Sequence, residues 1–158
     1  MLLEFKTKNY KSFVEESSFS MVAAPKQKGL DYSLMKTKVK GKEIRGLSSS
    51  VIYGPNAAGK TNIIGAMDVL RAIVLRGNIR NSEEKSSPNP AATALELIPS
   101  NNEAEGKPVY FSVEIYEEAE GGKFRILYEL EIDLGVFLDE EYPRKIISEN
   151  LFVNGEPI

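Results

Sequence analysis

The sequence has 158 residues, a formal net charge of −3, 42% hydrophobic residues and 27% charged residues, which is typical of one soluble globular domain. It contains no cysteine and no histidine, so disulfides, cysteine-ligated zinc and a histidine general base are excluded. Asp68 and Arg71 interrupt the most apolar stretch and no signal peptide precedes it, so we expect a cytoplasmic protein with no membrane partner.

The charges are unevenly distributed along the chain. Residues 1–50 contain 10 Lys/Arg and 5 Asp/Glu, whereas residues 101–158 contain 5 and 14. The basic first third could contact nucleic acid, could surround a triphosphate, or could simply carry solvated lysines on strands and loops. The acidic last third argues against a nucleic-acid surface there.

The first predicted element is a half-buried strand over residues 2–8, where apolar and charged side chains alternate. Residues 9–13 (NYKSF) are expected to turn the chain, and a second strand around residues 17–23 completes a hairpin. A further strand is expected near residues 36–40, followed by a turn at Gly41.

The strongest pattern in the sequence is a phosphate-binding loop. A short β-type run, Ser49–Tyr53, leads into residues 54–61 (GPNAAGKT), which have the form G-x-x-x-x-G-K-T, and an apolar helical pattern follows. A strand, this loop and a helix in that order predict the binding of a nucleotide's phosphates. The alternative is a glycine-rich turn that happens to precede a helix.

Each residue type in the loop has a physical reason. Gly54 permits a sharp exit from the strand, and Gly59 allows the backbone to approach phosphate without a Cβ atom. Lys60 is the candidate catalytic residue because its ammonium is placed to meet the β- and γ-phosphates, and the Thr61 hydroxyl is the candidate Mg²⁺ ligand. The residues expected to bind the nucleotide are Gly54, Asn56, Ala57, Ala58, Gly59, Lys60, Thr61 and Asn62.

The following helix is expected to have a broad apolar face over residues 63–75 and to end at Gly77. Residues 78–93 are rich in Asn, Ser, Glu, Lys and Pro and predict a long, mobile surface loop. The remainder is strand-like. The strands expected there cover residues 94–98, 109–116, 124–133 and 145–153, the second and third joined by a turn at Glu120–Gly122 and the last ended by Asn154-Gly155.

Residues 136–140 (VFLDE) have the form of an apolar strand that ends in two carboxylates, as Mg²⁺ polarisation in nucleotide hydrolysis requires. They follow the predicted hairpin directly, with no helical region between, and Pro143 comes soon after. We therefore interpret Asp139 and Glu140 as part of a connecting loop or strand end. If Asp139 is a metal partner instead, Asp139→Asn weakens Mg²⁺-dependent nucleotide binding.

The NYKSF segment at residues 9–13, followed downstream by GPNAAGKTN at residues 54–62, resembles the N-terminal lobe of ABC-type ATPases of the RecF, SMC and OLD group. The sequence looks closest to bacterial OLD-like "AAA family ATPase" proteins, several of which act in phage defence. The resemblance implies an α/β P-loop NTPase lobe with a large antiparallel β-subdomain, and ATP with Mg²⁺ as cofactors. It also implies that Lys11 and Ser12 approach the nucleotide phosphates, beside a central strand that ends in the phosphate loop.

Two features expected of a complete ATPase of this group are missing. The sequence shows no Ser-Gly-Gly-type signature motif, and it has no histidine for a switch residue. Residues 1–158 are therefore interpreted as a single, truncated nucleotide-binding lobe that hydrolyses ATP slowly or not at all by itself. In the intact protein the resemblance implies a head-to-tail homodimer around ATP, serving DNA maintenance or phage defence, with DNA as a partner of the whole assembly.

Two other functions stay open. A small P-loop phosphotransferase would need lid arginines, for which Arg76 and Arg80 are the only hint; a GTPase is disfavoured because Asn-Lys-x-Asp and Asp-x-x-Gly motifs are missing. Alternatively, the chain is a non-enzymatic interaction module with a vestigial phosphate loop. A competition assay with ATP, GTP and a phosphate acceptor distinguishes the phosphotransferase from the ATPase lobe. A titration with Mg·ATP that shows no heat would favour the interaction module.

Overall fold

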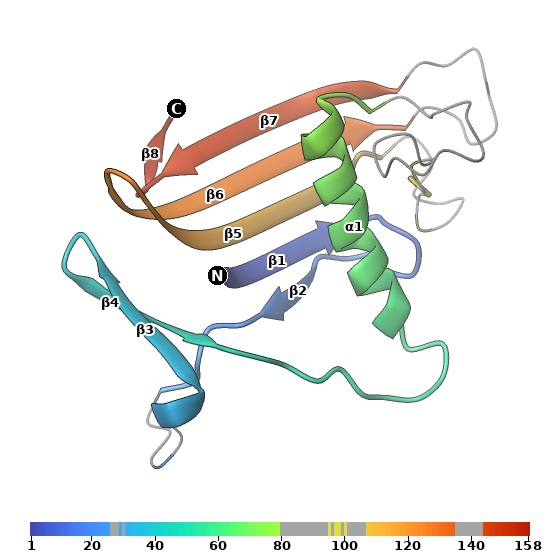
Figure 1. Ribbon diagram of the computed structural model, residues 1–158. Helices are drawn as coiled ribbons and strands as arrows, with labels where there is room; N and C mark the ends of the chain where they lie inside the picture. Colours follow the sequence, from blue (N-terminus) through green and yellow to red (C-terminus); the bar gives the residue numbers. More distant parts are fainter. Residues whose placement is uncertain are drawn as a thin grey trace.

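The computed structural model describes residues 1–25, 29, 31–79, 95, 97–98, 100, 107–134 and 144–158. Its main feature is a six-stranded sheet of order β2-β1-β5-β6-β7-β8, in which all neighbouring strands are antiparallel. One long helix, α1, crosses one face of this sheet (Figure 1). The strands are β1 (Leu2–Lys8), β2 (Ser17–Ser20), β5 (Val109–Ala119), β6 (Gly122–Asp133), β7 (Lys145–Val153) and β8 (Glu156–Pro157).

The β5–β6 hairpin is the centre of the sheet. Its register runs without a break from Val109 opposite Ile132 to Ala119 opposite Gly122, as the alternating apolar pattern predicts. Strand β1 pairs with β5, and β7 pairs with β6 and turns at Asn154-Gly155 into β8. The sequence therefore predicted the β5–β6 hairpin, the β7 strand and the turn that ends it, but neither the pairing of β1 with β5 nor strand β8.

Helix α1 spans Lys60–Arg76 and ends at Gly77, which adopts the left-handed conformation that the sequence predicted. Its buried stripe follows helical periodicity and packs on the sheet residues of β1, β5 and β6. Ala66 has no exposed surface, so a small side chain there permits a close approach of the helix to the sheet. The buried residues of α1 are Ile63, Ala66, Val69, Leu70 and Ile73.

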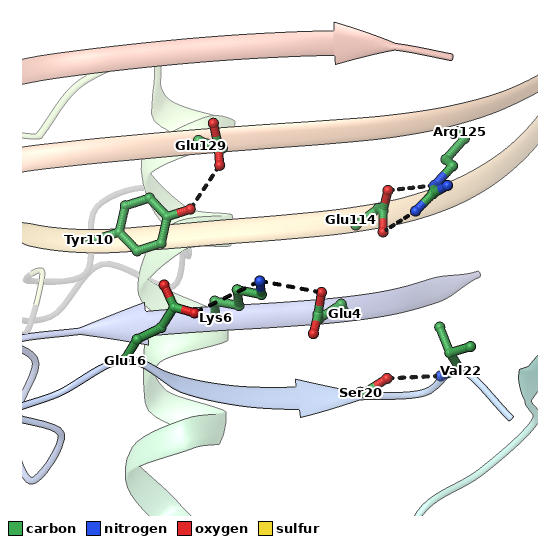
Figure 2. A network of polar contacts seen from close by, with 9 residues as sticks. All are labelled: Glu4, Lys6, Glu16, Ser20, Val22, Tyr110, Glu114, Arg125 and Glu129. Atoms are coloured by element: carbon green, nitrogen blue, oxygen red, sulfur yellow. Dashed lines mark hydrogen bonds and ion pairs between the residues drawn. The ribbon is translucent and has the colours of Figure 1, made fainter. Parts of the chain in front are cut away.

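The opposite face of the sheet is polar, because residues that alternate with the apolar ones point away from α1 (Figure 2). Arg125 donates two hydrogen bonds to Glu114, at 2.5 and 3.0 Å. The Tyr110 hydroxyl donates to Glu129 at 2.8 Å, and Lys6 lies within 3.8 Å of two glutamates. Burial raises the pKa of Tyr110 to about 12, and the Glu129 carboxylate adds to the increase.

A separate two-stranded sheet consists of β3 (Leu34–Val39), which follows the short 3-10 helix Asp31–Ser33, and β4 (Lys42–Leu47). The strand expected near residues 36–40 is thus present, and its turn lies at Lys40-Gly41. The sequence did not predict β4. A small second core, formed by Leu3, Val39 and Tyr116, joins this hairpin to the main sheet.

Two expected strands are not found among the described residues. Residues 49–53 are extended but are not a strand, and Val51 and Tyr53 are 83% and 90% exposed. A strand needs a neighbour for its backbone hydrogen bonds, and no described strand pairs with these residues. The α/β character expected from a central strand is therefore only partly present. Residues 95, 97 and 98 are not a strand either.

Two further expectations fall outside the described residues. They concern most of the mobile loop expected over residues 78–93 and the VFLDE segment at residues 136–140. The described part of the chain contains no helix with the length and apolar character that crossing a membrane requires.

Candidate functional site

The loop over residues 54–59 leads directly into α1 and lies open to solvent up to Ala58. The Ala58 N–H donates to the Pro55 carbonyl at 3.3 Å, which closes a tight turn. Ala57 and Gly59 have φ angles of 64° and 81°, in the left-handed region that most L residues avoid. The backbone therefore curls sharply before the helix, as a phosphate loop requires.

The N-terminal end of α1 lacks a side-chain cap. Gly59 is its N-cap residue and makes no side-chain capping hydrogen bond, and the first turn contains no acidic residue. The first N–H groups of a helix have no intrahelical partner, and the helix dipole adds a partial positive charge at this end. An anion can satisfy both, which makes this end of α1 suited to phosphate.

Lys60 folds back over this loop. Its ammonium donates hydrogen bonds to the carbonyl oxygens of Gly54 at 2.9 Å and Pro55 at 2.6 Å. The Lys60 ammonium is therefore held at the first two residues of the loop, although Lys60 itself is the first residue of α1. A bound phosphate would compete with these two carbonyls for the ammonium, and the charge of the anion favours the exchange.

The turn at residues 9–13 lies against the phosphate loop. The Asn62 side-chain amide donates to the Ser12 hydroxyl oxygen at 2.8 Å. A Cβ atom added to Gly59 would lie 2.9 Å from that oxygen and 3.3 Å from the Phe13 ring. Tyr10 is buried beneath α1 and meets Phe111 edge-on, with ring centroids 5.5 Å apart. The two sequence motifs therefore form one structural unit.

The predicted site residues are not all equally close to the loop. Ser12, Gly59 and Asn62 come together directly, whereas the Lys60 ammonium contacts the Gly54 and Pro55 carbonyls. The Lys11 ammonium lies 5.6 Å from the centre of the ring of the preceding residue, Tyr10, and close to the second turn of α1. The loop residues Gly54, Asn56, Ala57, Ala58 and Thr61 are exposed.

Sequence reasoning missed two residues that shape the site. Pro55 supplies a carbonyl acceptor to Lys60. Asn9 anchors the turn, because its side chain donates to the Lys107 carbonyl at 2.8 Å and accepts from the Ser100 N–H at 3.3 Å. An asparagine at the start of a polar turn is a signal for a left-handed residue, and Asn9 has φ 53°.

Protein ligands for a metal are few in the described ranges, where no group of three or more His, Cys, Asp or Glu could hold an ion. Magnesium in nucleotide sites is held by one or two protein oxygens together with phosphates and water. The exposed Thr61 hydroxyl, beside the bare end of α1, fits a metal ion that arrives with the nucleotide.

Comparison with protein families gives one finding. The family model described as "AAA domain, putative AbiEii toxin, Type IV TA system" matches residues 49–152, which include the phosphate loop, α1, β5, β6 and nearly all of β7. No curated protein is significantly similar to the sequence.

Proposed function

The chain belongs to this family of AAA domains, and we propose that it binds Mg·ATP at residues 54–62, as the nucleotide-binding lobe of an ABC-type ATPase of the RecF, SMC and OLD group. Membership in the family indicates a P-loop NTPase with a nucleotide-binding, ATPase-like function. We propose, beyond that membership, that the nucleotide is ATP, that the ATPase is of the ABC type, and that each residue has the role given below.

One observation carries the proposal. The positive end of a 17-residue helix has no side-chain cap and no acidic residue, and a lysine ammonium lies beside it on the loop carbonyls. The Asn62 and Ile63 N–H groups both donate to the Gly59 carbonyl, at 2.9 and 3.2 Å, so the N–H groups before them remain for a ligand or for water. The helix dipole and the ammonium both favour an anion there. A triphosphate supplies negative charge and many acceptor oxygens in the required place.

The residues then have separate tasks. The backbone N–H groups from Asn56 to Thr61 cradle the phosphates, and Lys60 leaves the carbonyls of its own loop to pair with the β- and γ-phosphates. The Thr61 hydroxyl would help to hold Mg²⁺, which would supply positive charge to offset that of the phosphates. Lys11 and Ser12 extend the site on the side of the 9–13 turn.

The resemblance supports the wider setting of this proposal. The turn at residues 9–13 lies against the loop, as expected for the RecF, SMC and OLD group. We place the protein in the cytoplasm, in DNA maintenance or phage defence, as part of a head-to-tail homodimer around ATP that engages DNA. The family description names a toxin of a type IV toxin–antitoxin system, which is an alternative setting for the same nucleotide site.

The test is calorimetric titration of the chain with Mg·ATP, Mg·GTP and magnesium alone. We expect binding of Mg·ATP, and Lys60→Ala should weaken it about 10- to 100-fold, because a charge-assisted hydrogen bond contributes about 1.5–3 kcal/mol. Lys42→Ala is the matched control, since Lys42 is an exposed lysine on β4, outside the site. No binding of Mg·ATP, or equal binding by Lys60→Ala, overturns the proposal.

Turnover by the same samples tests the ATPase assignment separately. We expect slow or undetectable phosphate release from ATP by this chain alone. Rapid hydrolysis that disappears in Lys60→Ala would show that the chain carries a complete catalytic site and would contradict the lobe assignment.

A further inference from the structure

The turn at residues 9–13 is strained but held on several sides. Asn9 and Lys11 have φ angles of 53° and 48°, which non-glycine residues rarely adopt. The Lys11 N–H donates to the Ile98 carbonyl at 3.0 Å, and Tyr10 and Phe13 exchange two backbone hydrogen bonds at 2.9 and 3.0 Å. Such conformations persist where the surroundings over-determine them, and they cluster at ligand sites.

A side-chain hydrogen bond between this turn and α1 joins Asn62 to Ser12. Asn62 is half-buried in the first turn of α1, whereas Ser12 is exposed. A hydroxyl has one hydrogen to donate and can accept two hydrogen bonds. Because Ser12 accepts from the Asn62 amide, its own hydrogen remains to be donated elsewhere.

The Ser12 hydroxyl lies beside the start of α1. Gly59, the residue that begins the bare end of α1, lies so close that a Cβ atom there would be 2.9 Å from the Ser12 oxygen. Ser12 is thus placed at the edge of the phosphate loop, where the proposed anion would offer acceptor oxygens. Without a partner such as Asn62, an exposed serine hydroxyl rotates freely among its rotamers.

We propose that Asn62 is a positioning residue, which does not contact the nucleotide but fixes the Ser12 hydroxyl as a hydrogen-bond donor to a phosphate oxygen. This inference rests on the proposed function, because it needs a phosphate at residues 54–61. It assigns Asn62 a role through Ser12, in place of the direct contact that its position in the loop motif suggests. It also explains why the turn must be rigid: a mobile turn would not hold Ser12 at the loop.

The experiment is a double-mutant cycle on the whole chain with Ser12→Ala, Asn62→Ala and the double variant. We expect Ser12→Ala to weaken Mg·ATP binding about tenfold, and Asn62→Ala about three- to tenfold, since hydrogen bonds to charged groups are among the stronger ones. In the Ser12→Ala background, Asn62→Ala should have no further effect on affinity. Inorganic tripolyphosphate should show the same losses, because the contact is to phosphate.

A matched control exists on β7. There the Asn150 amide donates to the Ser148 hydroxyl at 3.1 Å, an exposed Asn–Ser pair of the same chemistry outside the site. Ser148→Ala and Asn150→Ala should leave Mg·ATP affinity unchanged. The melting temperature of each nucleotide-free variant is measured alongside, so that a loss of stability is separated from a loss of affinity.

The outcomes are distinguishable. If the unmodified chain does not bind Mg·ATP, the proposed function fails and this inference fails with it. If the chain binds but Asn62→Ala changes only the melting temperature, or weakens binding equally with and without Ser12, the positioning role alone is overturned. Equal losses in the β7 control would also overturn it.

Discussion

The two ends of α1 look alike locally but are stabilised differently. Gly59 and Gly77 both adopt the left-handed conformation, with φ 81° and 66°. At the C-terminal end, the Gly77 N–H donates to the Ile73 carbonyl at 2.9 Å and Arg76 places a cation in the last turn. At the N-terminal end no side chain caps the helix. The C-terminal end of the helix is therefore capped within the chain, whereas its N-terminal end has no side-chain cap.

The space around the two glycines also differs. A Cβ atom on Gly77 would have no neighbour within 4 Å, whereas one on Gly59 would collide with Ser12 and press on Phe13. Gly77 is thus needed only for its backbone conformation. Gly59 is needed for its conformation and for the close approach of the 9–13 turn.

The largest predicted effect is that of Gly59→Ala. The left-handed conformation costs an ordinary residue about 1–2 kcal/mol and overpacking adds about 1–3 kcal/mol, so we expect a loss of about 3 kcal/mol in the free energy of unfolding. Urea denaturation measures it. We also expect the loss of detectable Mg·ATP binding, since the loop and the turn must move apart.

The next largest predicted effect is the stabilisation of the fold by Mg·ATP bound at the N-terminal end of α1. If the N-terminal end of α1 awaits a nucleotide, Mg·ATP at 100 times its dissociation constant stabilises the fold by about 2.7 kcal/mol. For a chain of this size that raises the melting temperature by about 8 °C. Calorimetry with Lys60→Ala as the reference checks the prediction, and an equal rise in that variant would contradict it.

Gly77→Ala should have a smaller effect than Gly59→Ala. The substitution meets no steric obstacle, so only the left-handed conformation opposes it, at about 1 kcal/mol. Urea denaturation of the two variants side by side gives the comparison. Equal losses in both would mean that the contact with Ser12 does not constrain the loop.

The smallest predicted effect is that of a charged side chain at the C-terminal end of α1. Leu75 is 64% exposed in the last turn of α1, so its replacement disturbs little packing. Leu75→Lys should be more stable than Leu75→Glu by about 0.5 kcal/mol, because cations favour the C-terminal end of a helix dipole. The difference should shrink in high salt. If Leu75→Glu were the more stable variant, the C-terminal end of α1 would not favour a cation, which would contradict the prediction.

Local patterns determined much of this fold. The β5–β6 hairpin follows from alternating apolar residues and a glycine turn, and α1 with its end at Gly77 follows from helical periodicity. The loop motif at residues 54–61 likewise identified where the helix begins. These features depend on neighbours close in sequence, so a single sequence suffices to predict them.

The extended segment before the loop shows the opposite case. Val51 and Tyr53 have the apolar character of a strand, yet both are largely exposed and no described strand pairs with them. Strand formation depends on hydrogen bonds to another segment, and a local pattern does not say whether that segment is present. The second hairpin strand, β4, was missed for a related reason, because its charged residues and its glycine hide the alternation.

By itself, the sequence determined the phosphate-loop motif, the helix that follows it and the antiparallel hairpins, because each is specified by residues a few positions apart. Only the tertiary structure decided that Ser12 meets Asn62 and Gly59, and that Asn9 fastens the turn to residues 100 and 107. Those contacts join segments far apart in the chain. Packing of β1, β5 and α1 around Tyr10 brings them together, and no local pattern encodes that packing.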